Sequence, residues 1–303
     1  GSEMVIRDSS GTARSEQAAR TDLCFSAGLA LTNIDIRGGA YILKSTALAS
    51  AQGDRHRFAR GLGIAANYAA SGGIRSWHRV ERMIEEIEAE AARTGDRYLE
   101  GAALGARSVR AFHCGPHADG LRYARATERA FRQLGGSMRE RVSAQIYQCM
   151  HLAKLGSWEA LSVERDRLYD EARARGDRFA ATVSRVGLCY LAWLANGQPA
   201  KERREIDGAM AEWDTNAFQV QHCAALMGHA HTDLYEQRPG QVVARVLGAA
   251  VRVRRSLLWR MPFIRVQLRD LEARAHLMLA DRTSSARRAL HLARVRFLAR
   301  RVR

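Results

Sequence analysis

A short pattern that recurs at a nearly constant spacing limits what this chain can fold into. Gly53-Asp54, Gly95-Asp96 and Gly176-Asp177 are each followed by arginine and a residue with a ring. Gly136 stands where a missing copy belongs, so successive copies lie 42, 41 and 40 residues apart, and a further step of 40 ends at Asn216. Glycine ends a helix in the left-handed conformation, and Asp or Ser after it accepts hydrogen bonds from the N–H groups opening the next helix. The pattern predicts a repeated junction between helices.

The prolines indicate the same period independently. Pro116, Pro199 and Pro239 are 83 and 40 residues apart, and each follows a break of the repeated Gly-Asp type by roughly 20 residues. Pro262 takes the same place in a last pair of helices. Because proline is tolerated in the first turn of a helix, each of these residues predicts the start of a helix, and the first three predict the start of the second helix of a pair. Two unrelated residue types therefore agree on a period of about 41 residues.

Between the breaks, apolar residues recur every three or four positions, as on one face of a helix. In 178–194, for example, Phe179, Val183, Val186 and Tyr190 form such a face. No segment shows the alternation typical of a strand. The intervals predict seven helical hairpins, at 14–33/38–51, 55–70/76–93, 97–112/117–134, 138–153/158–175, 178–195/200–213, 217–236/240–256 and 262–279/283–301.

A hairpin of this size buries its apolar face only by stacking on its neighbours. We therefore expect an all-α protein, a right-handed α-solenoid of about seven helical hairpins that is tetratricopeptide-like with a period of about 41 residues. Residues 13–303 are predicted to form a single helical-repeat domain. Residues 1–12 are predicted to be a flexible N-terminus, whose opening Gly1-Ser2 is typical of the remnant of a cleaved expression tag.

The closing segment combines a strong charge with a helical pattern. Residues 282–303 hold eight arginines and no acid. Ala286, Leu290, Ala293 and Phe297 nevertheless follow one another at steps of four, three and four, on one face of a helix. We expect 283–300 to be ordered as the second helix of the last pair, with this apolar face packed on residues 262–279 and with its arginines exposed.

The cysteines and the hydropathy indicate the compartment. An odd number of scattered cysteines without a CxxC motif predicts reduced thiols rather than a disulfide framework. The longest stretch without charged residues, 215–232, contains three histidines and is too polar to cross a bilayer. We therefore expect a cytoplasmic protein with no membrane partner. The five cysteines are Cys24, Cys114, Cys149, Cys189 and Cys223.

The positive charge is concentrated in the last part of the chain. Residues 237–303 carry 17 arginines against three acids, a net charge of +14, whereas residues 1–236 have a net charge of only +2. A cationic region of this kind can hold an acidic or phosphorylated protein or peptide, or a nucleic acid. Planar guanidinium groups near one turn can grip a carboxylate or a phosphate with two hydrogen bonds. The candidate ligand-binding residues are Arg252, Arg254, Arg255, Arg260, Arg265 and Arg269, with a solvated arginine-rich surface as the alternative.

Two groups of residues contain side chains of the kind that bind metal ions. His113, Cys114 and His117 share one turn, but no fourth ligand for a tetrahedral site is evident. His222 and His229 share a helix face two turns apart, which is too far for one ion, and His231 lies on another face. Core and surface histidines are the alternative in both cases. We predict no metal site and no cofactor.

Four segments resemble the carboxy-terminal helical-repeat region of large bacterial serine/threonine protein kinases. They are 179–195, 218–226, 233–235 and 255–260, which read FAATVSRVGLCYLAWLA, FQVQHCAAL, DLY and RSLLWR. The resemblance covers residues 36–280 and is strongest over 170–280. In that family a kinase domain and a P-loop ATPase module precede a tetratricopeptide-like tail, so the resemblance implies that this chain is a regulatory or sensory tail.

No catalytic motif of that family stands in this sequence. A glycine-rich phosphate loop, a VAIK lysine, HRD, DFG and GxxxxGK[ST] are all missing. We therefore expect this chain to have no enzymatic activity and to recognise a protein or peptide. Two other hypotheses stay open: a nucleic-acid-binding repeat that uses the basic C-terminal third, and a sensor of a small acidic ligand.

Overall fold

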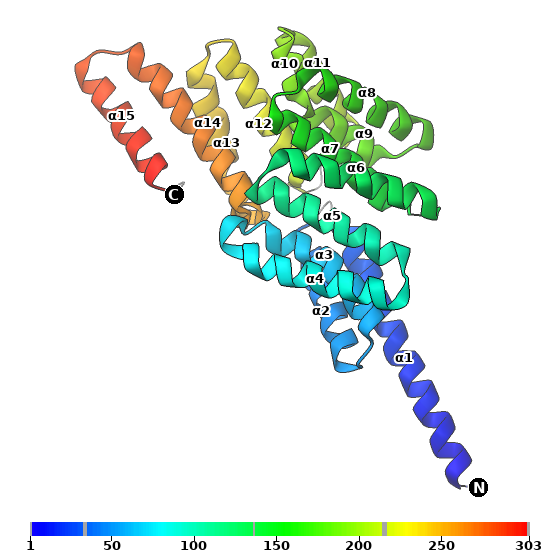
Figure 1. Cartoon of the computed structure of the whole chain (residues 1–303). Coiled ribbons are helices and arrows are strands. Elements are labelled where there is room, and N and C mark those ends of the chain that lie inside the picture. The colour runs from blue at the N-terminus through cyan, green and yellow to red at the C-terminus, as the bar shows by residue number, and fades with distance from the viewer. Residues whose placement is uncertain (1, 33–34, 136, 214–216, 302–303) are drawn as a thin grey trace. The chain divides into compact units, whose positions relative to one another are not determined.

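The computed structural model describes residues 2–32, 35–135, 137–213 and 217–301, with side chains from residue 15 onward. Every regular element in this part of the chain is a helix, which confirms the all-α prediction for the described residues (Figure 1). None of these helices is both long and apolar enough to cross a membrane. Gly136 and Asn216, two members of the repeated pattern, lie outside the described residues.

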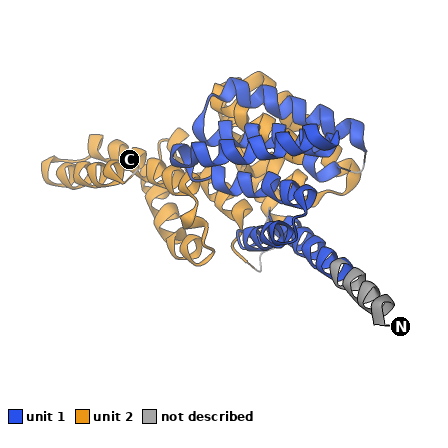
Figure 2. Cartoon of the chain, turned by 60° about the horizontal axis from the view of Figure 1, so that its bottom comes forward, with its two compact units in different colours: residues 1–141 blue, residues 142–303 orange. Residues whose placement is uncertain are grey.

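Residues 1–141 form one compact unit (blue in Figure 2). From α1 to α6, helices that follow one another in the chain pack against each other, and α3 also packs on α5. The contact between helices two apart is what stacked hairpins require. The helices of this unit are α1 (Ser2–Leu31), α2 (Gly38–Ala51), α3 (Arg55–Ala70), η1 (Gly73–Ser76), α4 (Trp77–Thr94), α5 (Arg97–Cys114), α6 (His117–Leu134) and the start of α7 (Met138–Leu155).

Residues 142–303 form the second compact unit (orange in Figure 2). Here sequential helices pack together from α8 to α15, and α9 also packs on α11 and α12 on α14. After α7 its helices are α8 (Trp158–Arg175), α9 (Arg178–Val186), η2 (Leu188–Tyr190), α10 (Leu191–Ala195), α11 (Pro199–Ala211), α12 (Val220–Tyr235), α13 (Pro239–Arg255), η3 (Leu258–Arg260), α14 (Pro262–Asp281) and α15 (Ser285–Arg300).

The Gly-Asp junctions have the geometry that the sequence predicts. Gly95 ends α4 with a φ of 67°, and Oδ1 of Asp96 accepts hydrogen bonds from the N–H groups of Tyr98 and Leu99. Gly176 ends α8 with a φ of 69°, and Asp177 caps α9 in the same way. A left-handed glycine followed by an N-cap carboxylate therefore connects one hairpin to the next.

The prolines also stand close to their predicted places. Pro199, Pro239 and Pro262 lie in the first turn of α11, α13 and α14. Pro116 lies one position earlier, as the N-cap residue of α6. Proline lacks an N–H group, and the N–H groups of the first turn have no intrahelical acceptor, so these positions cost no hydrogen bond.

The helix predicted over 178–195 is broken in the structure. It ends at Val186, and the chain continues through η2 into the short helix α10. Gly187 turns the chain with a ψ of −170°, and a Cβ atom at this position would lie 2.8 Å from the carbonyl oxygen of Val183. Glycine is a weak helix former by about 1 kcal/mol relative to alanine. The break buries the ring of Tyr190, whose hydroxyl lies 3.0 Å from Nδ1 of His231.

The last helix forms as predicted but rests on a different face. α15 packs on α14 with Leu298, which is buried, while Leu290 is 72% and Phe297 46% exposed. The prediction that the face of Leu290 and Phe297 packs on residues 262–279 is therefore wrong. Ser284 occupies the N-cap position of α15, although its side chain makes no capping hydrogen bond. Helical periodicity identifies an apolar face but does not tell which face meets the neighbouring helix.

Candidate functional site

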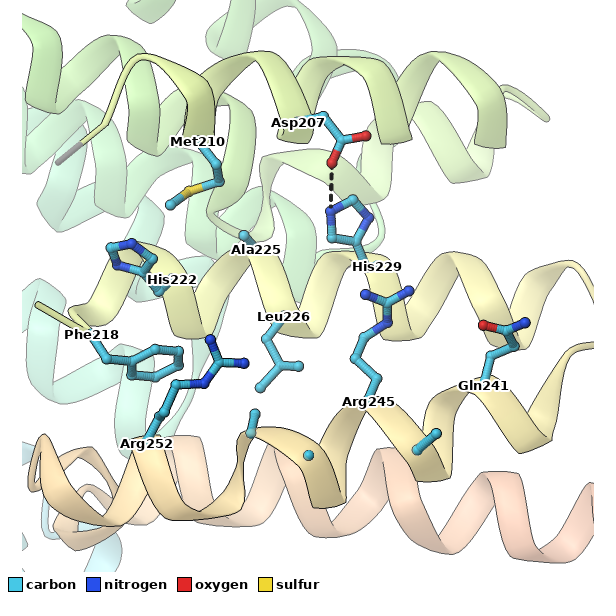
Figure 3. A pocket seen from close by; sticks show the side chains of 13 residues that line it. Asp207, Met210, Phe218, His222, Ala225, Leu226, His229, Gln241, Arg245 and Arg252 are labelled. Carbon is cyan, nitrogen blue, oxygen red and sulfur yellow. Dashed lines mark ion pairs between the residues drawn. The ribbon is translucent and has the colours of Figure 1, made fainter. Parts of the chain in front are cut away.

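Three consecutive helices of the second unit line an open groove with a volume of about 600 Å³ (Figure 3). We call it the α11–α13 groove. α11 contributes Asp207 and Met210, and α12 contributes its face from His222 to His229. α13 contributes Gln241, Ala244, Arg245, Gly248, Ala249 and Arg252, and Phe218 precedes α12 at one end.

The open space of the groove exists because α13 carries small residues on the side that faces it. Gln241, Ala244, Gly248 and Arg252 follow at steps of three or four and so share one face of this helix. Ala244 and Gly248 are exposed, and a Cβ atom at Gly248 would meet no atom within 4 Å. Because the middle of this face carries almost no side chain, a ligand could approach the backbone of α13 closely.

An aromatic ring and a guanidinium group meet at one end of the groove. The guanidinium carbon of Arg252 lies 5.4 Å from the centre of the Phe218 ring, a cation–π distance. His222 stacks on the same ring, with 5.5 Å between the ring centres. Nδ1 of His222 accepts a hydrogen bond from the N–H of Gln219, so the neutral ring carries its proton on Nε2. Arg252 is exposed and forms no ion pair with a carboxylate of a described residue.

A histidine and an aspartate meet at the α11 wall. Nε2 of His229 lies 3.1 Å from Oδ1 of Asp207, and Figure 3 shows the two side chains facing one another. Burial lowers the pKa of His229 below its usual value, and the charge of Asp207 opposes this effect only in part. The lowered pKa favours the neutral imidazole of His229 at pH 7.

The second arginine of the groove, Arg245, forms an ion pair with a buried aspartate. Nε of Arg245 donates to Oδ2 of Asp233 at 2.9 Å, and Arg203 donates to the other oxygen at 2.6 Å. Arg203 also binds Glu236. Asp233 is 2% exposed, so two cations compensate one buried carboxylate. Arg245 is thus fixed in position, whereas Arg252 keeps its charge available.

The groove combines three kinds of contact for a ligand. Arg252 supplies a positive charge, His222 supplies an imidazole ring, and Met210, Phe218 and Leu226 supply apolar surface. The lining residues include no serine, threonine, cysteine, lysine or tyrosine that the His229–Asp207 pair could activate as a nucleophile. The arrangement suits binding of an anionic group next to an apolar one.

The six arginines predicted from the sequence do not form one site. Arg252 belongs to the α11–α13 groove. Arg254, Arg265 and Arg269 gather around Trp259 of η3, and we call these four residues the Trp259 arginine cluster. Arg255 and Arg260 are exposed, and neither makes a contact with the Trp259 ring among the cation–π contacts of the described residues.

Geometry in the Trp259 arginine cluster favours anions. The guanidinium carbons of Arg254 and Arg269 lie 5.8 Å and 5.2 Å from the indole ring centre, and Arg265 donates to the Trp259 carbonyl at 3.4 Å. Burial lowers the pKa of Arg269, and the charges of Arg265 and Arg301 lower it further. No ion pair with a described carboxylate neutralises these three arginines. Like charges held together in this way are stabilised by an anion.

The histidine and cysteine groups considered for a metal have other surroundings. Among the described residues, no three His, Cys, Asp or Glu side chains are arranged to hold a metal ion. Burial lowers the pKa of His113 to about 4, and His117 lies near the ring of Phe112. His231 meets the Tyr190 hydroxyl, on a different face of α12 from His222 and His229. The five cysteines are free thiols.

Sequence reasoning missed most of the groove. It placed His222 and His229 on one face of a helix, and this face lines the groove. Asp207, Phe218 and Arg245 carried no signal, because each comes from a different helix or loop and only the packing of α11, α12 and α13 brings them together. Comparison of the chain with protein-family models and with curated proteins found no match.

Proposed function

We propose that this chain is a non-catalytic helical-repeat domain that binds an acidic peptide segment of a protein partner in the α11–α13 groove. One observation carries the proposal: Arg252 stands exposed on the Phe218 ring, at the end of an α13 face whose middle, Ala244 and Gly248, carries small residues. The surrounding chain has no acid between Arg238 and Arg269. Its field attracts an acidic segment, and its apolar residues give such a segment a surface to bury.

The dimensions of α13 suggest how the peptide lies. Gln241 and Arg252 are eleven residues apart on this helix, a distance of roughly 16 Å. An extended peptide covers that distance with about five residues. We infer that an acidic residue of the peptide reaches Arg252 and that an apolar neighbour packs against Leu226 and Met210.

The proposal has a second part, which concerns the fold type and the parent protein. We propose that the hairpins form a right-handed tetratricopeptide-like solenoid and that the chain is the cytoplasmic regulatory region of a bacterial serine/threonine kinase. Packing of sequential helices from α1 to α6 and from α8 to α15, and of helices two apart at α3–α5, α9–α11 and α12–α14, supports the solenoid. The segments quoted above, from 179–195 to 255–260, support the kinase connection.

Nucleic-acid binding is a second candidate function, and the Trp259 arginine cluster is the observation that favours it. Three arginines around one indole ring could hold a phosphate and stack on a base. Such binding would weaken steeply with salt, because each phosphate contact releases counterions. We rank it second because the cluster is not continued by a row of further aromatic side chains: the other phenylalanine, tyrosine and tryptophan residues of 237–303 are Phe263 and Phe297.

Fluorescence anisotropy tests the proposal with two labelled ten-residue peptides, one of alternating Glu and Leu/Phe and the other with Lys in place of Glu. We expect the acidic peptide alone to bind. Arg252→Glu should weaken binding about tenfold, because it reverses the exposed charge. Ala244→Trp should weaken it as strongly by filling the groove without changing any charge.

Arg204→Glu is the matched control, since Arg204 is an exposed arginine of α11 outside the groove lining. It changes the net charge by the same amount and should leave binding nearly unchanged. Acidic-peptide binding that survives both Arg252→Glu and Ala244→Trp would overturn the proposal. Tighter binding of a 20-base-pair duplex DNA, lost when Arg254 and Arg269 are replaced by Glu, would favour the second candidate instead.

A further inference from the structure

The fold leaves one apolar stripe of α15 unused. Ala286, Leu290, Ala293 and Phe297 are all exposed, Leu290 by 72% and Phe297 by 46%. The helix rests on α14 through another face, on which Leu298 is 3% exposed and His291 and Val295 are half-buried. A stripe of two large apolar residues that takes no part in the fold points to another binding partner.

The spacing of the stripe suits another helix. Its steps of four, three and four are those of a coiled-coil seam, in which apolar residues recur every 3.5 residues on average. Large residues at Leu290 and Phe297 alternate with small ones at Ala286 and Ala293. Small residues between large ones let side chains of a facing helix insert into the seam.

Arginines border the stripe. Arg287, Arg294 and Arg301 follow it on one side at intervals of seven residues, and Arg296 lies on the other. The guanidinium carbons of Arg294 and Arg301 lie 5.3 Å and 4.9 Å from the Phe297 ring centre, so charge and apolar surface adjoin. These are the flanking positions whose charges select the partner of a coiled coil.

We propose that this stripe of α15 docks an amphipathic helix of a partner protein whose flanking residues are acidic. Charge complementarity identifies the occupant, because residues 282–301 contain no acid that could supply the opposite charge. A second copy of this chain would place arginines against arginines, and like charges at these positions disfavour pairing. An anionic membrane fits less well, since helices that lie in a membrane surface present a wide face of large apolar residues.

The test uses the full chain and two designed 28-residue helices with Leu along the seam, one flanked by Glu and the other by Lys. We expect the Glu helix to bind and the Lys helix not to bind, as measured by fluorescence anisotropy. The double variant Leu290→Ser/Phe297→Ser should lose at least tenfold in affinity. Because both side chains are exposed, its melting temperature should stay that of the wild type.

A charge exchange makes the test sharper. Arg287→Glu/Arg296→Glu should reverse the preference, so that the Lys helix binds and the Glu helix does not; Arg294 is left in place because it pairs with the buried Glu272. Val163→Ser on α8, which also removes an exposed apolar residue, and Arg204→Glu on α11, an exposed arginine outside the groove lining, are controls that should leave helix binding unchanged.

Four results would overturn the proposal. The Glu helix could fail to bind the wild type, or bind the Leu290→Ser/Phe297→Ser variant equally well. Vesicles of phosphatidylserine and phosphatidylcholine could bind through Leu290 and Phe297 while the Glu helix does not, which would make the stripe a membrane contact. Concentration-dependent dimers that disappear in the same variant would make it a contact between copies of this chain.

Discussion

The hydroxyl group of Thr232 on α12 donates a hydrogen bond to Oε2 of Glu202 on α11. Glu202 has no exposed surface, and its Oε1 has no hydrogen-bond partner among the described residues. Burial raises the pKa of Glu202 to about 7, and the bond from Thr232 opposes this rise only in part. The folded protein therefore holds this carboxyl group more readily in its neutral form.

This contact predicts a pH dependence of stability. The pKa of Glu202 is raised from 4.5 to about 7 on folding, so its contribution is fully present below pH 4.5 and is lost as pH rises through 7. Glu202→Gln should remove this loss and stabilise the protein at pH 8.5 by up to about 3 kcal/mol. Melting temperatures of wild type and variant at pH 5.5 and 8.5 measure the effect. The exposed Glu159→Gln should show no such difference, and equal pH profiles for wild type and Glu202→Gln would contradict the assignment.

Two leucines of α15 should differ in their effect on stability. Leu298 is buried against α14, so Leu298→Ala should destabilise the protein by about 2 kcal/mol. Leu290 is 72% exposed, so Leu290→Ala should change stability by less than about 0.5 kcal/mol. Urea unfolding of both variants makes the comparison. The reverse order would mean that α15 packs on the face that its periodicity suggests.

Two helical glycines should respond to alanine in opposite directions. A Cβ atom at Gly228 of α12 would collide with Cδ1 of Ile206 and come within 3.2 Å of Tyr190, so Gly228→Ala should destabilise by about 1–3 kcal/mol. Gly248 of α13 has open space around it, and Gly248→Ala should stabilise by about 0.5–1 kcal/mol because alanine is the better helix former. Thermal unfolding followed by circular dichroism distinguishes the two cases.

The capping role of Asp177 at its Gly-Asp junction predicts how its replacement changes the stability of the protein. Its carboxylate accepts a hydrogen bond from the N–H of Ala180 at 3.0 Å and so caps α9. Asp177→Ala should cost about 1 kcal/mol of stability, whereas Asp177→Asn should keep most of it, because asparagine caps nearly as well. Chemical denaturation measures both. An equal loss in the two variants would indicate that the charge of Asp177, rather than its capping bond, stabilises the protein.

The helices and their junctions could be predicted because their causes are local. A left-handed Gly95, a capping Asp96 and a first-turn Pro199 act within one turn of chain, so their effects can be recognised without knowing the neighbours. The exception is the stretch around Gly187. Its apolar periodicity indicated one helix, but burial of Tyr190 against α12 favours a break at the glycine.

The candidate site could be predicted only in part. Arginine content identified the cationic region, yet the six candidate arginines separate into a groove residue, a cluster around Trp259 and two surface residues. Their separation depends on where η3 turns the chain between α13 and α14. The left-handed conformation of Leu257, with a φ of 63°, belongs to this turn, and no glycine marks it in the sequence.

Apart from the break at Gly187, the sequence by itself determined roughly where helices begin and end, because capping, glycine conformation and helical periodicity act over a few residues. Only the tertiary structure decided which helix faces are covered. The α11–α13 groove exists because α13 turns Ala244 and Gly248 toward α11 and α12, and the stripe of Leu290 and Phe297 is exposed because α15 rests on Leu298. Burial of an apolar face depends on the shape of a neighbour distant in sequence, and periodicity carries no information about that neighbour.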